Sequence, residues 1–548
     1  MSENDTKEAG MNLMRKSARV LVSMLLALAL TQIARADDEG SHKPMIGDVH
    51  FKVECNAAAQ ARFNVAVAYY HSFQWQRAIA TADDVLKADP TCGMAHWVKA
   101  LAILDNPFAW PVTLSEKAMT EGPILLDAAR KAGLKTQRER DYVDALEVFF
   151  KGLNNANYRE RADAFEKAMA QLAQRNADDS EATVLYALIL SRNFDPTDKT
   201  YSNQLHAAKL LEPIFARQPN HPGVAHYLIH SYDYPPLAKR GIGAARKYAK
   251  IAPDAPHALH MPSHIFTLTG FWQESIDTNR RAAATADDAI THDGHHASDY
   301  MAYAHLQLAQ DLAARKVMEQ EQARHGIDML GVAYPYAAIP ARIALERGAW
   351  QEAANLPLYS RNTYPWKKYP QAEAVNAFAR GIGSAMSGEL GKANFEAKRL
   401  AKLRDVAAAM KLNYWADQIE IQADVVRGLT AFAEGKHDEG IAILRRAAER
   451  EDASAKNVVT PGPVVPAREM LATTLERGGK PADALAEFEK VLEQQPNRYR
   501  AIAGAAQNAK RGGNEQKAVH YSEQLLELAR HADSPRPETV EAKRILGR

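Results

Sequence analysis

A helical pattern that returns every 34 residues constrains this chain more than any other feature of its sequence. In the segment 480–496, KPADALAEFEKVLEQQP, the small residue Ala484 precedes Phe488 by four positions and Pro496 by twelve. Ala518 occupies the position of Ala484 one step of 34 residues later. Small residues allow two antiparallel helices to touch, and a proline ends the second helix. The pattern therefore predicts helical hairpins that stack one on the next.

The N-terminal part of the chain carries the same register. Small, aromatic and proline residues recur there at the matching offsets, at Ala66, Tyr69, Ala78 and Pro90. Weaker copies are centred on the turn glycines Gly270, Gly348 and Gly435. Runs of alternating β-branched residues, which are typical of strands, do not occur. These offsets are typical of the tetratricopeptide repeat (TPR), so we expect an all-α fold, a TPR-like α-solenoid of stacked antiparallel helical hairpins.

The organisation predicted from the sequence has four parts. They are a signal peptide over 1–36, a TPR-like α-solenoid over 37–457 with a histidine-rich central segment over 221–311, a linker over 458–466, and a C-terminal TPR pair and tail over 467–548. The linker is assigned from its proline and valine content, which interrupts the helical periodicity.

The composition and the missing motifs argue against several classes of function. The 548 residues carry 68 Lys and Arg against 67 Asp and Glu, so the chain lacks the basic excess of a nucleic-acid binder. Two cysteines exclude a multi-cysteine zinc or iron–sulfur site within the chain. The sequence contains no complete phosphate-binding loop, no HExxH and no GxSxG, so no nucleotide site or serine hydrolase is expected.

The first 36 residues have the three parts of a secretory signal. Basic residues start it, an apolar core covers Val20–Leu30, and the small-x-small site Ala34–Ala36 ends it. The acidic stretch before the basic residues suggests that translation starts at Met11 or Met14. We expect an exported protein, periplasmic in a Gram-negative bacterium or else secreted, with no membrane span after cleavage. The alternative is an uncleaved membrane anchor, although the core is short for one.

Export would place the two cysteines in a compartment where a disulfide can form. Cys55 and Cys92 lie 37 residues apart, close to one repeat, and each lies near the start of the first helix of its hairpin. Stacked hairpins would bring the two thiols together, and an oxidising compartment would let them pair. We therefore expect a Cys55–Cys92 disulfide, with two unpaired buried thiols as the alternative.

Histidines are concentrated in one part of the chain. Of the 19 histidines, 11 lie between His206 and His305. The first dense segment is 221–236, HPGVAHYLIHSYDYPP, where His226, His230 and Asp233 are spaced i, i+4, i+7. Residues with that spacing share one face of a helix.

Two further segments follow at steps of about 35 residues, close to one repeat. In 252–270, APDAPHALHMPSHIFTLTG, His257, His260 and His264 share a face if the segment is one helix, although Pro262 predicts a bend or a new helix start. In 291–311, a predicted helix pairs His295 with Asp299, and His296 with Tyr300.

We expect the first helices of successive hairpins to line one concave face, so that these histidines point into one common pocket. Converging imidazoles are a good ligand set for Zn²⁺, copper or iron. The predicted metal ligands are His226, His230, His257, His260, His264 and His295. The predicted orienting or additional residues are Asp233, Asp299, His296 and Tyr300. Two alternatives stay open: a polar pocket that uses the histidines as acids and bases, and a purely structural histidine network.

The chain resembles a family of exported bacterial TPR proteins that is largely uncharacterised. The resemblance rests on the segment 221–276, which contains HALHMPSHIF, and is supported by the segment 71–97. It implies stacked helical hairpins and no settled reaction. The histidines of the family's motif match His226, His230, His257, His260 and His264. A Gly-His pair that opens the third helix in related sequences matches Gly294-His295, but the choice between His295 and His296 stays open.

These observations predict an exported α-solenoid with a histidine-rich, metal-binding pocket on its concave face. A catalytic role for the bound metal is one reading, although no catalytic residue or substrate is indicated. The alternative function is a non-catalytic scaffold that binds a protein or peptide partner on the concave face, with structural histidines.

Overall fold

The computed structural model describes residues 44–111, 114–151, 158–287, 291–358, 364–454 and 457–548. The predicted signal peptide, 1–36, lies outside the described residues. The contacts divide the chain into two compact units, Met1–Met45 and Ile46–Arg548. Within the described residues, all regular secondary structure is helical, and none of the helices is long and apolar enough to cross a membrane.

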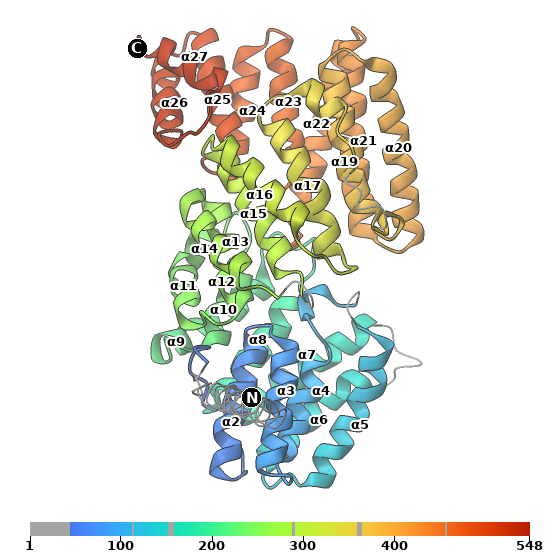
Figure 1. Ribbon diagram of the computed structural model, residues 1–548, viewed down its shortest axis with the longest axis vertical. Helices are drawn as coiled ribbons and strands as arrows, with labels where there is room; N and C mark the ends of the chain where they lie inside the picture. The colour runs from blue at the N-terminus through green and yellow to red at the C-terminus, as the bar shows by residue number, and fades with distance from the viewer. Residues whose placement is uncertain (1–43, 112–113, 152–157, 288–290, 359–363, 455–456) are drawn as a thin grey trace, which may run out of the picture. The chain divides into compact units, whose positions relative to one another are not determined.

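The N-terminal helices form successive antiparallel pairs, as Figure 1 shows. They are α2 (Ala57–His71), α3 (Trp75–Ala88), α4 (Gly93–Ala102), the 3₁₀ turn η1 (Pro107–Ala109), α5 (Glu116–Ala132), α6 (Gln137–Phe150), α7 (Tyr158–Arg175), α8 (Ser180–Arg192) and α9 (Ser202–Arg217).

The central helices carry eight of the 19 histidines. They are α10 (Pro222–Tyr232), α11 (Ala238–Ile251), α12 (Pro256–His260), α13 (Pro262–Thr269), α14 (Trp272–Thr285), α15 (Asp293–Gln307), α16 (Asp311–Ala323), α17 (Leu330–Glu346) and α18 (Trp350–Ala354).

The C-terminal helices continue the same arrangement. They are the 3₁₀ turn η2 (Trp366–Lys368), α19 (Pro370–Met386), α20 (Leu390–Ala409), α21 (Asn413–Ala433), α22 (His437–Ala453), α23 (Ala467–Arg477), α24 (Pro481–Gln494), α25 (Tyr499–Arg511), α26 (Glu515–Leu528) and α27 (Pro537–Ile545). The predicted TPR-like α-solenoid of antiparallel helical hairpins is confirmed.

The small residues of the repeat lie where the helices touch. Ala66 of α2 and Ala78 of α3 are both fully buried, and α2 packs against α3. Ala472 and Ala484 take the same places in α23 and α24 and are equally buried. Since a larger side chain would push the paired helices apart, these positions keep the hairpins in close contact.

Gly270 shows why a glycine stands at one of the turns. It ends α13 with a left-handed φ of 72°, which L side chains rarely adopt. A Cβ at this position would also come within 2.4 Å of the carbonyl oxygen of Pro496. The turn after α13 thus needs a glycine both for its backbone conformation and for its contact with the residues that follow α24.

The cysteines singled out by the sequence are joined in the structure. A disulfide links Cys55 to Cys92, with their Cα atoms 5.2 Å apart. Cys55 precedes the residue that caps α2, and Cys92 is the residue before α4. The bond therefore connects the starts of the first helices of two successive hairpins.

The segment 458–466 joins α22 to α23 without forming a helix. It packs closely against α17, because the buried Arg342 guanidinium donates hydrogen bonds to the carbonyl oxygens of Gly462 and Pro463 and to the hydroxyl of Thr460. Residues 46–548 form one compact unit by their contacts. The division of the chain at this segment stays a prediction.

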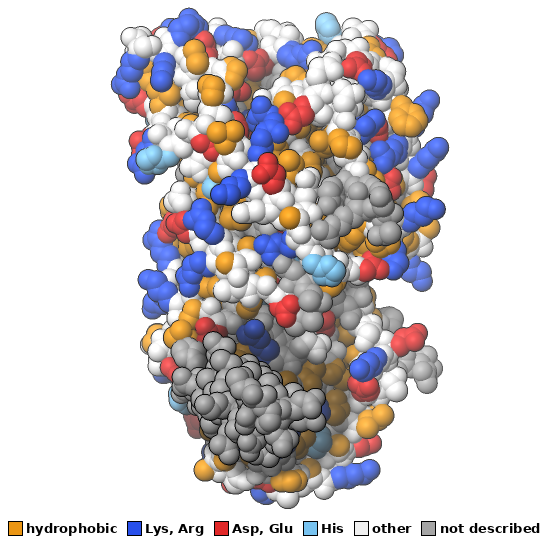
Figure 2. All heavy atoms as spheres, in the orientation of Figure 1, with side chains coloured by type: hydrophobic (Ala, Val, Ile, Leu, Met, Phe, Trp, Pro, Cys, Tyr) orange, Lys and Arg blue, Asp and Glu red, His pale blue; other side chains and the backbone are white. Residues whose placement is uncertain are grey.

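Charges of both signs are mixed on the surface. Figure 2 shows basic and acidic side chains interspersed over the face in view, with apolar side chains scattered between them. This pattern agrees with the near-zero net charge of the sequence.

Candidate metal centre

The helix α10 is built to place histidines in the interior. Pro222 occupies its first turn, and the His221 ring caps it by accepting the backbone N–H of Val224. All 11 residues of the helix are buried. His226 and His230, one turn apart, therefore point side by side into the protein rather than into solvent.

Pro262 starts a new helix. The helix α12 ends at His260, and α13 begins at Pro262, which has no N–H to contribute to a continuous helix. His257 and His260 thus lie on the five-residue helix α12, and His264 lies on α13. The sequence allowed a bend or a new start at this proline, and the structure has the new start.

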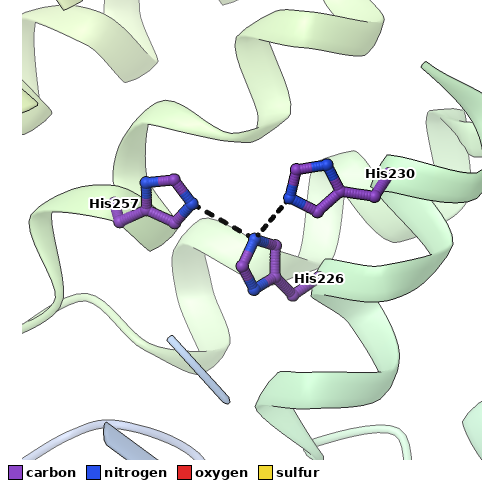
Figure 3. Close-up of side chains that lie close together, drawn as sticks. All are labelled: His226, His230 and His257. Atoms are coloured by element: carbon purple, nitrogen blue, oxygen red, sulfur yellow. Dashed lines mark hydrogen bonds between the residues drawn. The ribbon is translucent and has the colours of Figure 1, made fainter. Parts of the chain in front are cut away.

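The first histidine group consists of His226, His230 and His257, shown in Figure 3. The Nε2 atom of His226 lies 3.0 Å from Nε2 of His230 and 3.2 Å from Nε2 of His257. The Nδ1–H of His226 donates to the backbone carbonyl of His71 at 2.7 Å. Because a carbonyl can only accept, this bond leaves the Nε2 lone pair of neutral His226 directed at the other two rings.

Aromatic rings enclose the first group. Phe73 stacks on His257 with ring centroids 5.1 Å apart, and Phe108 stacks on His230 at 4.0 Å. Burial, reinforced by the neighbouring His230 and His257, holds the pKa of His226 well below its usual range. The His226 ring is therefore kept neutral, which is the form that binds metal ions.

The second group consists of His260, His264 and His296. The Nε2 atoms of His260 and His264 lie 3.0 Å apart. The ring of His296, on α15, lies 4.2 Å from the ring of His260 between centroids. All three residues are buried, with at most 6% of their surface exposed. The candidate ligand atoms of each of the two groups lie within 4.8 Å of one another.

Hydrogen bonds fix the tautomers in the second group. His264 Nδ1 donates to the carboxylate of Asp233 at 2.8 Å, and His260 Nδ1 donates to Oδ1 of Asn279 at 2.7 Å. The amide nitrogen of Asn279 is itself used as a donor to Ser275, so its oxygen is the acceptor. The Nε2 atoms of both neutral histidines therefore carry lone pairs, and these lone pairs face each other.

The electrostatics of the second group also favour neutral rings. Burial lowers the pKa of His260 to about 3, with the neighbouring His257 contributing. Burial and the adjacent imidazoles hold the pKa of His296 well below its usual range. The Nδ1 atom of His296 is buried and has no hydrogen-bond partner among the described residues. Protonation of the His260 and His296 rings is thus disfavoured, and their ring nitrogens are in the form that binds a metal ion.

The sequence predicted one common pocket, and the structure forms two neighbouring groups instead. His257 and His260 are three residues apart on α12, and their ring centroids lie 6.4 Å from each other. Because the turn between them rotates the two side chains apart, His257 joins the first group and His260 joins the second. The helix α12 therefore contributes one histidine to each group.

His295 does not belong to either group, which corrects the predicted ligand set. Its ring bonds the carboxylate of Glu321 at 2.6 Å and the backbone carbonyl of His325 at 2.8 Å. His296, predicted only as an orienting residue, takes its place in the second group.

Of the other residues predicted to orient the ligands, Asp233 and Tyr300 contact His264, whereas Asp299 does not. Asp233 accepts from His264, and the ring of Tyr300 stacks on that of His264 with centroids 4.9 Å apart. Asp299, by contrast, forms a fully buried ion pair with Arg342, at 2.8 Å between Oδ1 and Nε. Its role is therefore to hold Arg342 rather than to orient a histidine.

A third cluster, not predicted from the sequence, supports the first. The Glu181 carboxylate bonds the rings of His71 and His221, each at 2.9 Å. Burial alone would raise the pKa of Glu181, but the two imidazoles outweigh it and hold that pKa well below its usual range. His71 also bonds Tyr227, and His221 caps α10, so all four ring nitrogens have partners. This cluster fixes the backbone of His71, whose carbonyl orients His226.

The geometry of the two histidine groups fits transition-metal binding. With metal–nitrogen bonds of about 2.0–2.1 Å, two ligands of a tetrahedral ion lie about 3.3 Å apart. The observed separations of 3.0 and 3.2 Å are close to that value. The residues therefore define a TPR-like α-solenoid with two adjacent, buried tris-histidine groups.

Comparisons with known proteins concern the solenoid. No family model and no curated protein match the sequence. Among solved structures, the chain is similar to yeast Tom70, with 11% identity over 89% of each chain and a TM-score of 0.27. It is also similar to a human IFIT1 dimer with PPP-AAAA, with 11% identity over 87% of this chain and 92% of that one and a TM-score of 0.35. The TPR domain of P58(IPK) is 10% identical over 90% of this chain and 99% of that one, with a TM-score of 0.22.

Proposed function

We propose that this protein binds transition-metal ions at its two tris-histidine groups, one ion in each. The observation that carries the proposal is the pair formed by His260 and His264, whose Nε2 atoms lie 3.0 Å apart while both Nδ1 atoms are already bonded to acceptors. A cation beside two facing lone pairs would bind both of them, and burial disfavours a proton on the His260 ring.

The surrounding residues orient the rings. Asp233 and Asn279 each accept a ring N–H in the second group, and the carbonyl of His71 does so in the first. Such hydrogen bonds fix the tautomer and raise the basicity of a ligating histidine. Three hydrogen bonds of this kind, in two adjacent groups, support a metal-binding role over a histidine network that only fills space.

The donor set narrows the choice of metal. Both groups offer three imidazoles, with no thiolate, and imidazole suits zinc, copper and iron. When bound, an ion held by three protein ligands can polarise a fourth ligand in its open position as a Lewis acid.

We also propose that the protein acts after export from the cytoplasm. Residues 14–36 have the pattern of a signal peptide. The Cys55–Cys92 disulfide supports this location, because such bonds persist in oxidising compartments.

Elemental analysis of the purified chain tests the metal proposal. After incubation with Zn²⁺, Cu²⁺ or Fe²⁺ and desalting, the wild-type protein should retain one ion for each of the two groups. His230→Ala and His264→Ala should each lose about one of them. His520→Ala, at an exposed position on α26, is the matched control and should retain both. A chain that takes up none of the three metals would rule the proposal out.

A further inference from the structure

A cavity of about 260 Å³ is lined by residues from both the central and the C-terminal parts of the fold, and none of the described histidines lines it. Its walls come from α21, α22, the segment 458–466 and several central residues. The aromatic side chains that line it include Tyr201, Tyr234, Tyr334, Tyr414 and Trp415. Cavities that hold a whole drug-sized ligand measure about 300–1,000 Å³, so this one suits a smaller group or a short stretch of chain.

Two glutamines on one face of α21 have buried polar atoms that lack partners. Gln418 and Gln422 are four residues apart, in line with Tyr414, and all three line the cavity. Within the described part of the chain, neither Nε2 of Gln418 nor Oε1 of Gln422 has a hydrogen-bond partner, although both atoms are buried. A buried donor or acceptor without a partner destabilises the folded protein. The cavity thus presents one donor and one acceptor, a helical turn apart, to whatever enters it.

Glu451 adds an acidic group to the same wall. Its carboxylate accepts the backbone N–H of Ala467 at 2.8 Å. The nearest basic side chains are engaged elsewhere: Arg468 with Asp452 and Glu487, and Arg498 with Glu346 and Glu469. No ion pair joins Glu451 to a basic residue in the described ranges. Burial raises the pKa of Glu451 to about 8, and the neighbouring Asp452 adds to this effect, so the free protein holds this side chain protonated at neutral pH. A cation in the cavity would favour its ionised form and pair with it.

We infer that this cavity binds a peptide segment that carries a basic side chain. One peptide group offers a carbonyl to the Gln418 amide and an N–H to Gln422, which satisfies both buried atoms. The aromatic rings cover the apolar part of the segment and attract a cation to their faces. The Glu451 carboxylate pairs with the basic side chain. The site is separate from the histidine groups, and its function does not depend on metal.

Saturation-transfer NMR with two capped tripeptides tests the inference. The probes are acetyl-Leu-Arg-Leu-amide and acetyl-Leu-Glu-Leu-amide. The wild-type chain should bind the arginine peptide and not the glutamate peptide. Gln418→Leu and Gln422→Leu should each weaken binding of the arginine peptide about tenfold, the loss of one hydrogen bond. Glu451→Gln should bind the two peptides alike, because it removes the charge and keeps the shape.

The same variants give a second readout. Gln418→Leu removes a buried donor without a partner, so it should raise the Tm of the free protein while it weakens peptide binding. Gln516→Leu, at an exposed position on α26, is the matched control and should change neither. Wild-type protein that gives no saturation transfer to the arginine peptide would overturn the inference. So would Gln418→Leu and Gln422→Leu variants that bind it as tightly as the wild type.

Discussion

The Nε2 atoms of His260 and His264 lie 3.0 Å apart, although hydrogen bonds to Asn279 and Asp233 fix both as lone-pair donors. Two neutral imidazoles in this arrangement would both direct lone pairs at a cation bound between them. The stability of the fold should therefore depend on metal.

Metal removal should lower the Tm. A ligand that binds only the folded state stabilises it by about 2.7 kcal/mol at a concentration one hundred times its Kd. Differential scanning calorimetry with and without a chelator measures the loss. In a doubly substituted His230→Ala, His264→Ala chain, the chelator should have no effect. An equal shift in that variant would place the metal elsewhere.

Asp233→Asn should weaken metal binding at the second group only. Loss of a carboxylate that orients a ligating histidine typically costs 10–100-fold in affinity. Competition with a chromophoric chelator measures the two affinities, and that of the first group should stay at the wild-type value. Asp277→Asn, on the exposed side of α14, is the control. Equal weakening at both groups would show that Asp233 acts on the fold rather than on His264.

His295→Ala should lower the stability of the fold and His296→Ala should lower the metal content. His296→Ala removes a proposed ligand and should lose about one ion per chain. His295→Ala should retain both ions but lose stability, because it leaves Glu321, only 1% exposed, without its partner at 2.6 Å. Breaking a buried pair in this way costs about 3–5 kcal/mol. Metal content and urea denaturation separate the outcomes, and metal loss in His295→Ala would restore the original assignment.

Glu451 should make stability depend on pH. Its pKa of about 8 in the folded protein lies above the value of 4.5 for a free glutamate. Between those two values the folded state binds more protons than the unfolded state, so its contribution to stability falls as pH rises through that window. The stability of Glu451→Gln relative to the wild type should therefore increase as the pH rises from 4.5 to above 8. Parallel stability–pH curves for the two proteins would contradict the assignment.

The Cys55–Cys92 bond should stabilise the N-terminal hairpins. It closes a loop of 37 residues, and the chain-entropy relation assigns a loop of that length about 4 kcal/mol. The Cys55→Ser, Cys92→Ser double variant should have a free energy of unfolding lower by this amount, and urea denaturation measures the difference. A reductant should reproduce the effect in the wild type and leave the double variant unchanged.

The repeat was predictable because it is local. Ala484 and Phe488 occupy fixed offsets within one hairpin, and the contacts that require them lie within the same hairpin. The histidine pairs on α10 were predictable for the same reason, since residues four apart share a helix face whatever surrounds them.

The choice between His295 and His296 could not be made from the sequence. Successive residues of a helix point about 100° apart, so the answer depends on how α15 is rotated about its axis. That rotation is set by tertiary contacts, among them the pairs His295–Glu321 and Asp299–Arg342. The separation of one pocket into two groups depends in the same way on the break at Pro262.

The carbonyl of His71 has a consequence for how the protein matures. It ends α2 and orients His226, which lies 155 residues later in the chain. A nascent chain that has emerged only as far as α10 has His226 and His230 but not yet His257. A complete chain whose first hairpin has not packed against α10 lacks the carbonyl of His71 as an acceptor for the His226 ring. Metal loading of the first group would thus report that distant parts of the polypeptide have come together. If the groups bind metal as proposed, a chain that misfolds at its N-terminus would remain metal-poor, and its metal content would distinguish it from the correctly folded protein.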